Sequence, residues 1–251
     1  MQHFINLGPE DLAEHHLCCA LGDKKHTGGV QAKKDWLRER FKEGLIFRKL
    51  DVRGKVFIEY MPAEHSWRPI LAPNWLVVHC LWVSGKFHGH GHGRALVDYA
   101  LQDAAGQGKA GLIIAAARTK RPFMSDPKFL KHLGFEVYDQ AEEWLLFGKA
   151  LRQDAAPPRF SDAVHAPGVQ EHFVASVSPQ CPFNQHWAPN LVEDLRARGH
   201  HAELRQLESA EACQSVASPL GAFSLEAKGK LFSHHLTTPN ATTRMLAKKL
   251  D

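Results

Sequence analysis

The chain has 251 residues, of which 44% are hydrophobic and 23% charged, and Lys and Arg outnumber Asp and Glu by 31 to 27. These values are typical of one large or two small globular domains and exclude a disordered tail, a fibre or a coiled coil. No apolar run of about 18 residues and no signal-peptide pattern is present, so we expect neither a membrane span nor secretion. The basic residues are scattered, which does not favour nucleic acid as a partner.

Five cysteines are present, an odd number, and their spacing fits neither a zinc site nor a disulfide framework. We therefore expect a cytoplasmic protein with reduced thiols. Histidine is frequent, at 17 of 251 residues, so a metal site has to be considered.

Runs typical of strands alternate with runs typical of helices up to residue 150, which favours an α/β fold. The expected strands cover residues 4–7, 45–52, 55–60, 75–83, 111–117, 135–138 and 142–150. The expected helices cover residues 9–21, 30–44, 93–105 and 127–132.

The expected strand over residues 75–83 is apolar almost throughout, as in a strand buried on both faces. The two runs before it are separated by Arg53 and Gly54, which predicts an antiparallel hairpin. Regular alternation along residues 75–83 predicts that the following side chains share one face of the strand: Val77, His79, Leu81 and Val83. The other face would then carry Val78, Cys80 and Trp82.

A glycine-rich loop links this strand to the amphipathic helix that follows. Glycines let the backbone approach a ligand closely, and the first amides of a helix lack intrahelical acceptors, so such a turn suits a phosphate. The P-loop pattern is absent because no Gly-Lys-Ser/Thr follows Gly93. The dinucleotide pattern is absent because Gly89, Gly91 and Gly93 are each two residues apart. The spacing predicts a pyrophosphate loop without a ribose-binding acidic residue.

The same loop carries His88, His90 and His92, which also fit a flexible exposed loop or a nickel or zinc clip. Three histidines at two-residue spacing lack a defined fourth ligand and supporting hydrogen-bond partners, so we expect no metal. Arg94 adds positive charge, whereas neutral imidazole contributes only donors at pH 7.

His88, Gly91 and Gly93 also fit the coenzyme A loop Gln/Arg-x-x-Gly-x-Gly/Ala, and the chain thereby resembles the GNAT acetyltransferases. His88 stands where that family usually has Gln or Arg. Four further segments resemble the YoaP-type members of the family, which carry an extra C-terminal domain; they cover residues 58–67, 80–87, 122–137 and 221–236.

The resemblance implies the GNAT acyl-CoA acyltransferase fold, with a mixed, mostly antiparallel sheet. It also implies an acetyl-CoA-dependent N-acetyltransferase that acts on a small-molecule amine by direct attack on the thioester. Coenzyme A would present its pyrophosphate to the loop amides and its peptide-like pantetheine arm to the edge of the preceding strand. The expected coenzyme A contacts are Leu81, Trp82, Val83, His88, Gly89, His90, Gly91, His92, Gly93 and Arg94.

An amine that attacks a thioester must lose a proton. The resemblance implies a glutamate base at the position of Val77, so that role is vacant. His79, two residues further on, is the first candidate base, with a hydrogen-bonded core histidine as the alternative. Glu59 and Glu64 are further candidates for proton transfer or for binding a cationic substrate. The alternative for each is a solvated charge at the edge of the sheet. Many members of the family use a tyrosine as the general acid for the departing coenzyme A thiolate. Leu130 occupies that position here, so the role of general acid is not carried over.

Residues 151–168 are rich in Ala, Pro, Asp and Ser and are interpreted as a linker between an acetyltransferase domain (1–150) and a smaller α/β domain (169–251). The order of expected elements in the smaller domain resembles a thioredoxin-like domain. Cys181 begins its first helix and Asn184 replaces the second cysteine, so no internal disulfide is possible. The helix N-terminus makes Cys181 a candidate reactive thiol, with a scaffold for substrate binding or dimer contact as the alternative.

Two other functions stay open at this point. One is a thiol-dependent redox or binding module in which Cys181 acts and the larger domain binds coenzyme A without catalysis. The other is a non-catalytic binding protein. Residues 22–43 and 62–74 are expected to shape the acceptor pocket, and the sequence allows either a monomer or a homodimer.

Overall fold

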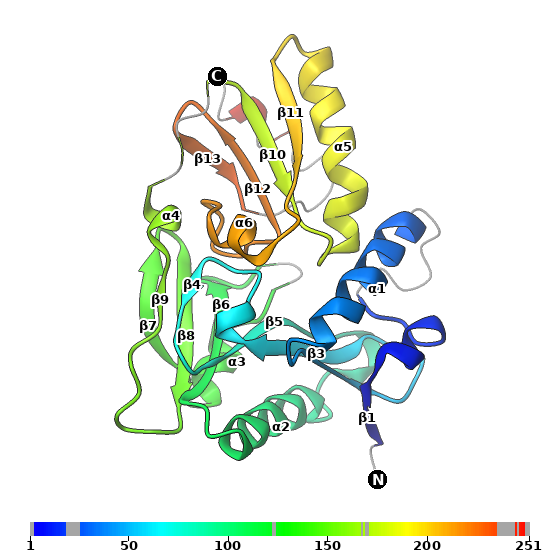
Figure 1. The fold of residues 1–251 in the computed structure, drawn as a ribbon, viewed down its shortest axis with the longest axis vertical. Helices are drawn as coiled ribbons and strands as arrows, with labels where there is room; N and C mark the ends of the chain where they lie inside the picture. The colour runs from blue at the N-terminus through cyan, green and yellow to red at the C-terminus, as the bar shows by residue number, and fades with distance from the viewer. Residues whose placement is uncertain are drawn as a thin grey trace. The chain divides into compact units, whose positions relative to one another are not determined.

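The structure is a computed structural model that describes residues 3–18, 26–121, 124–166, 168, 171–234, 244 and 246–248. The chain divides into two units, shown together in Figure 1. Unit 1 comprises Met1–Leu21, Leu37–Ser66 and Ile70–Phe160. Unit 2 comprises Gly22–Trp36, Trp67–Pro69 and Ser161–Asp251, so it includes two short segments from the N-terminal half of the chain.

Unit 1 is built on a seven-stranded sheet with the order β1-β2-β3-β5-β6-β8-β7. The neighbours β5 and β6 are parallel, and the other neighbouring pairs of this sheet are antiparallel. The expected mixed, mostly antiparallel sheet is therefore confirmed. Its strands are β1 (Phe4–Leu7), β2 (Ile46–Leu50), β3 (Val56–Pro62), β5 (Leu76–Val83), β6 (Gly111–Ala117), β7 (Glu136–Ala141) and β8 (Trp144–Ala150). A separate antiparallel pair joins β4 (Ile70–Leu71) to β9 (Arg159–Phe160).

The main apolar core of unit 1 lies between the sheet and α2 (His92–Gly106), which packs against β3, β5 and β6 (Figure 1). Leu96, Val97, Ala100 and Ala104 recur at the spacing of one helix face and are buried, as the sequence predicts. The shorter α3 (Pro127–His132) begins at Asp126, whose side chain accepts a hydrogen bond from the Lys128 amide.

The helix expected over residues 9–21 is much shorter in the structure. A 3₁₀ helix, η1, covers Pro9–Ala13, and residues 19–21 lie outside the described part of the chain. The Asp11 carboxylate accepts a hydrogen bond from the Gly8 amide and fixes the start of this turn. The next helix, α1 (Thr27–Phe41), begins earlier than the expected residue 30, and the boundary between the two units falls within it.

A β-bulge in β5 changes which residues share a face of that strand. Glu59 of β3 is opposite Cys80, whereas Tyr60 is opposite Val78, so His79 is the extra residue. Val78 belongs to the core beneath α2, and Leu81 and Val83 also pack against that core. The predicted regular alternation is therefore wrong beyond residue 79, because one extra residue reverses the order of the faces.

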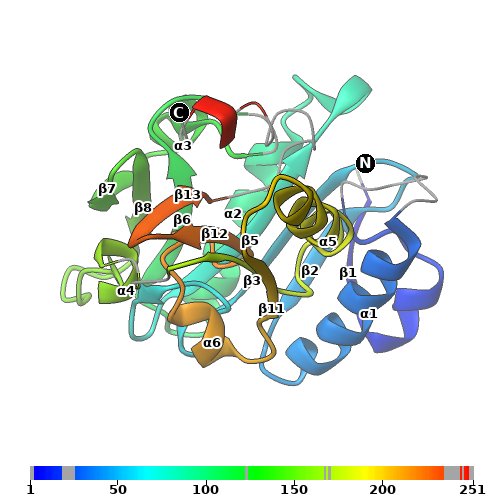
Figure 2. The same cartoon turned by 90° about the horizontal axis from the view of Figure 1, so that it is seen from above.

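Unit 2 contains a four-stranded sheet with the order β11-β10-β12-β13, in which β10 and β11 are parallel and the remaining neighbours antiparallel. Its α5 (Pro182–Ala197) contacts β10 and β11 and contributes Leu191 and Leu195 to the core; Figure 2 shows α5 beside β11. The elements of unit 2 are β10 (Phe173–Val177), β11 (Ala202–Gln206), β12 (Phe223–Ala227), β13 (Lys230–Ser233), α4 (Asp162–His165) and α6 (Ala210–Gln214). The sequence also predicts a helix after the last strand of this unit, and most of the residues there lie outside the described part of the chain.

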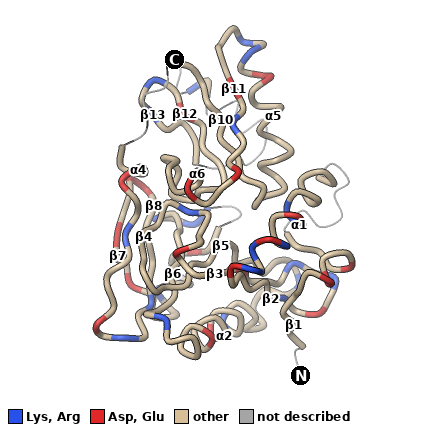
Figure 3. Tube along the Cα trace, viewed as in Figure 1, with Lys and Arg blue, Asp and Glu red and all other residues tan. Residues whose placement is uncertain are grey.

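Acidic and basic residues are interspersed along both units (Figure 3). In the described part of the chain, no helix is long and apolar enough to cross a membrane. The described residues also contain no group of three or more His, Cys, Asp or Glu side chains placed to hold a metal ion.

Candidate functional site

The loop between β5 and α2 has the backbone conformation that its glycines predict. Gly89 has φ of +80° and Gly91 has φ of +78°, values in the left-handed region that favours glycine. Gly91 is the N-cap of α2, and no side chain caps the helix. The amides of the first turn therefore lack intrahelical acceptors and lie at the positive end of the helix dipole. This end of α2 suits an anionic group.

The three loop histidines have different surroundings. His88 and His90 are exposed, as is Arg94, whereas His92 is buried. The ring of His92 lies edge-on to Phe87, with 5.9 Å between ring centroids. Of the three imidazoles, that of His92 thus packs inside the protein.

β5 and β6 run side by side only at their beginnings. Their parallel register covers Leu76 with Leu112 and ends at Val78 with Ile114. Beyond that point β6 continues to pair with β8, and β5 continues to pair with β3 on its other side. Residues 81–83 of β5 therefore lie beyond the part of the strand that pairs with β6. An extended ligand can add to the edge of a strand as a further strand.

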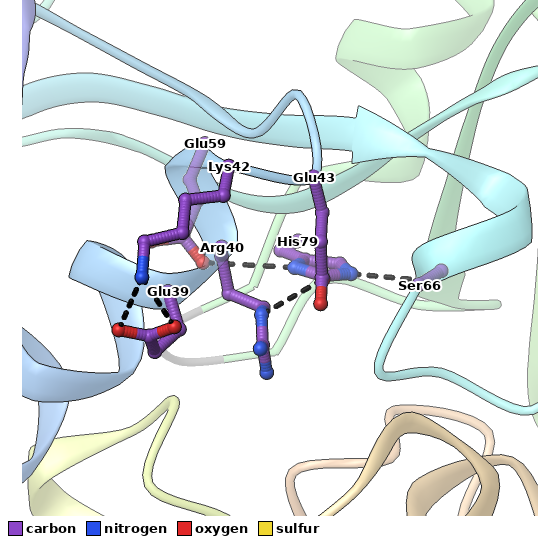
Figure 4. Close-up of polar contacts among 7 residues, drawn as sticks. All are labelled: Glu39, Arg40, Lys42, Glu43, Glu59, Ser66 and His79. Atoms are coloured by element: carbon purple, nitrogen blue, oxygen red, sulfur yellow. Dashed lines mark hydrogen bonds and ion pairs between the residues drawn. The ribbon is translucent and has the colours of Figure 1, made fainter.

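Glu59, His79 and Ser66 come together on the face of the sheet away from α2. Glu59 on β3 is opposite Cys80 on β5, and at the bulge His79 lies beside Glu59. Oε1 of Glu59 lies 3.8 Å from Nδ1 of His79, and Oγ of Ser66 lies 3.0 Å from Nε2 of the same ring. Figure 4 shows the imidazole lying between the carboxylate and the hydroxyl.

This cluster is buried. The side chains of Glu59 and His79 are 0% exposed, and Ser66 as a whole is also 0% exposed. A carboxylate removed from water needs charged or hydrogen-bonding partners, and the imidazole supplies one. The low dielectric strengthens the attraction between the carboxylate and a protonated imidazole. The arrangement can therefore take up a proton on the ring and stabilise the resulting charge.

Glu64, the third predicted acid–base candidate, lies apart from this cluster. Its Oε1 accepts a 2.6 Å hydrogen bond from the Asn74 amide, and its Oε2 lies 3.7 Å from Nζ of Lys109. Asn74 precedes β5, whereas the glycine loop follows it, so the carboxylate lies near the opposite end of that strand. Asn74 has φ of +67°, and the bond from Glu64 supports this turn. Leu130, at the position of the family's tyrosine, is fully buried in the core and offers no donor.

Cys181 in unit 2 is the N-cap of α5 and is half-buried. The buried Lys33 donates a 2.9 Å hydrogen bond to the carbonyl of the preceding Gln180, so an ammonium group lies near this turn. Cys213, in contrast, is fully buried, and this burial raises the pKa of its thiol to about 12. The two thiols thus have very different surroundings.

The first segment expected to shape the acceptor pocket, residues 22–43, belongs partly to unit 2, and residues 22–25 lie outside the described part of the chain. His26 packs edge-on against Phe183, with 4.4 Å between ring centroids. The second segment, residues 62–74, contains Ser66, which no sequence pattern indicates as a site residue. A serine in a loop carries no spacing signal, and its partner lies 13 residues away along the chain.

The sequence model of the acetyltransferase (GNAT) family matches residues 10–135. The chain therefore belongs to the GNAT acetyltransferase family, which confirms the predicted membership, and it is an acyltransferase.

One relative is YoaP of Bacillus subtilis (strain 168), described as an uncharacterized N-acetyltransferase. It is 34% identical over 253 residues, with 97% of this chain and 98% of YoaP covered. The chain is also similar to a solved GNAT acetyltransferase from Brucella melitensis in complex with acetyl-CoA (TM-score 0.42, 16% identity, 62% of this chain and 92% of that chain). A third similar protein is the PaiA N-acetyltransferase from Thermoplasma acidophilum in complex with coenzyme A (TM-score 0.42, 15% identity, 59% and 99% covered).

Proposed function

We propose that this acyltransferase moves the acetyl group of acetyl-CoA to the amine of a small molecule, by direct attack of the amine on the thioester. The observation that carries the proposal is the end of the β5–β6 pairing at Val78. It leaves a strand edge that runs from the buried His79 to the phosphate-type turn at the start of α2. A ligand with an anionic end and a peptide-like arm fits this sequence of features.

In this proposal the pyrophosphate binds at the amides of residues 89–94, and the pantetheine arm pairs along Leu81, Trp82 and Val83. Arg94 is exposed beside the loop and adds positive charge for the phosphates. His88 is also exposed, and its imidazole can donate one hydrogen bond where the family usually has a longer polar side chain. The thioester then lies near the bulge of β5.

The transfer step needs a proton acceptor, and we assign that role to His79 supported by Glu59. The amine nitrogen forms a bond to the thioester carbon, the carbon–sulfur bond breaks, and coenzyme A leaves as a thiolate. The proton released by the amine passes to the imidazole, whose charge the Glu59 carboxylate stabilises. In this proposal a backbone amide at the bulge donates a hydrogen bond to the oxyanion. The thiolate is a weak base and leaves without an acid at the position of Leu130.

We further propose that residues 1–150 carry the acetyltransferase activity, residues 151–168 are a linker, and residues 169–251 form a thioredoxin-like domain. The strand–helix–strand–helix–strand–strand order of β10 to β13 and the sheet order β11-β10-β12-β13 support the last assignment. Asn184 donates its side-chain amide to the Ala222 carbonyl and so has a structural contact in place of a second thiol. We propose that this domain binds substrate rather than exchanging disulfides.

The proposal is tested by combining coenzyme A binding with a thiol-release assay. Isothermal calorimetry is expected to show saturable binding of coenzyme A. Incubation with acetyl-CoA and a panel of amines, amino acids and aminoglycosides is expected to release thiol with at least one acceptor and yield an acetylated product by mass spectrometry. Absence of coenzyme A binding at millimolar concentration contradicts the whole proposal. Binding without thiol release from any acceptor supports a non-catalytic binding protein instead.

A further inference from the structure

Ser66 is held in place by the backbone around it. It follows the short 3₁₀ helix η3 (Ala63–His65), and its amide donates a 3.1 Å hydrogen bond to the carbonyl of Ala63. The amide of Ala63 in turn donates a 2.9 Å bond to the carbonyl of Trp75, immediately before β5. The turn that carries Ser66 is thus attached to the same strand that carries His79.

The polar side chains beside the two ring nitrogens of His79 indicate where the proton of its neutral ring lies. Oε1 of Glu59 lies 3.8 Å from Nδ1, and its negative charge favours the tautomer with the proton on that nitrogen. Nε2 then carries the lone pair and accepts a hydrogen bond from the Ser66 hydroxyl. Both ring nitrogens therefore face a polar side chain of the protein.

Of these two neighbours, one can pass a proton on to the ring. The hydroxyl of Ser66 can accept one hydrogen bond while it donates another, whereas the carboxylate of Glu59 faces the nitrogen that already holds a proton. We propose that Ser66 relays the acceptor's proton to His79, an inference that rests on the proposed acetyl transfer. As the nitrogen–carbon bond forms, the amine proton moves to Oγ of Ser66 while the Ser66 proton moves to Nε2 of His79.

Glu59 completes the relay, because its carboxylate stabilises the imidazolium that forms. All three side chains are buried, so the proton moves within the protein instead of into bulk water. The same order of hydroxyl, imidazole and carboxylate occurs in enzymes that use a nucleophile, a base and a group that orients the base. Here, in contrast, the hydroxyl transfers a proton and forms no covalent bond to the acetyl group.

The test compares Ser66→Ala, Ser66→Thr and Glu59→Gln with the wild-type protein. For Ser66→Ala, kcat should fall by about 10- to 100-fold with the acetyl-CoA KM unchanged. The Ser66 hydroxyl bonds the ring in both states and bonds the charged imidazolium more strongly, so its loss disfavours the protonated ring and should move the acidic limb of the pH–rate profile to lower pH. Glu59→Gln removes the charge that stabilises the imidazolium and should move this limb to lower pH. Ser66→Thr keeps the hydroxyl and should restore most of the activity.

Ser209→Ala is the matched control, since it also removes a hydrogen-bonded serine hydroxyl, the N-cap of α6, and should leave the pH profile unchanged. A wild-type kcat and pH profile for Ser66→Ala overturns the relay while the proposed function stands. A wild-type protein that transfers acetyl to no acceptor overturns both.

A measurement on the wild-type protein covers the case in which Ser66→Ala does not fold. Nitrogen-15 NMR of the imidazole that disappears in His79→Gln is expected to show the Nδ1-protonated tautomer at neutral pH. The Nε2-protonated tautomer would contradict the relay, because Nε2 could then accept no proton from Ser66.

Discussion

His16 is a partly buried histidine in unit 1 whose surroundings disfavour its charged form. Burial is the largest cause and the nearby Lys49 ammonium the next, and together they lower the pKa of His16 from 6.5 to about 4. Lys49 is itself buried, and that burial lowers the pKa of its ammonium group. In the unfolded chain His16 titrates near its ordinary value.

The stability of the fold should therefore fall as the pH drops from about 6.5 to about 4. In that window the unfolded chain binds a proton at His16 and the folded chain does not, so protonation favours unfolding. The free energy of unfolding from urea titrations should fall from pH 7 to about pH 4.5, and it should fall less in His16→Gln. An equal fall in both proteins would show that His16 is not the cause.

At the scale of elements, the bulge in β5 and the turn into α2 decide the geometry of the site. At the bulge His79 lies beside Glu59, and the turn leaves the first amides of α2 without a side-chain cap. Both features depend on local backbone conformation. Gly91 and Gly108 offer a matched pair to test the turn, since both have positive φ (+78° and +65°) and an added Cβ meets nothing within 4 Å at either.

Gly91→Ala and Gly108→Ala should cost similar stability, about 1 kcal/mol each, because alanine is strained at positive φ. Gly91→Ala should also raise the KM for acetyl-CoA about 10-fold, since the strain is relieved by moving the amides proposed to bind the pyrophosphate. Replacing Gly108, which lies beyond the C-terminal end of α2, should leave this KM unchanged. Steady-state kinetics and thermal denaturation of both variants provide the comparison, and equal KM values would exclude the loop from coenzyme A binding.

At the scale of the whole molecule, unit 2 is assembled from three separate stretches of chain. Arg68 donates a 2.7 Å hydrogen bond to the Leu220 carbonyl, and a Cβ on Gly29 would lie 2.5 Å from the carbonyl oxygen of Pro182. Glycine at position 29 thus permits a close backbone approach within this unit. These contacts explain why two short N-terminal segments are grouped with the C-terminal residues.

Direct attack requires acetyl-CoA and the amine to be bound at the same time. Initial rates measured against both substrates should therefore give intersecting double-reciprocal lines. Cys181→Ser should keep kcat/KM within about twofold of wild type, because the thiol takes no part in the proposed reaction. Parallel lines, together with loss of activity in Cys181→Ser, would instead support an acetyl group carried by that thiol.

The sequence by itself determined most of the secondary structure and the class of the protein. β6 and α3 begin and end where the periodicity predicts, and the hairpin around Arg53 and Gly54 forms as expected. These features arise from interactions between residues close in the chain, which periodicity and turn residues report directly. The glycine spacing before α2 likewise indicated the family that the comparison confirmed.

The tertiary structure alone decided which candidates meet. It separated Glu64 from Glu59, brought Ser66 to His79, and reversed the faces of β5 beyond the bulge. None of these outcomes follows from local pattern, because each depends on the register between strands and on where a loop packs. A single extra residue in β5 changes the side to which all later side chains point, and only the pairing with β3 reveals it.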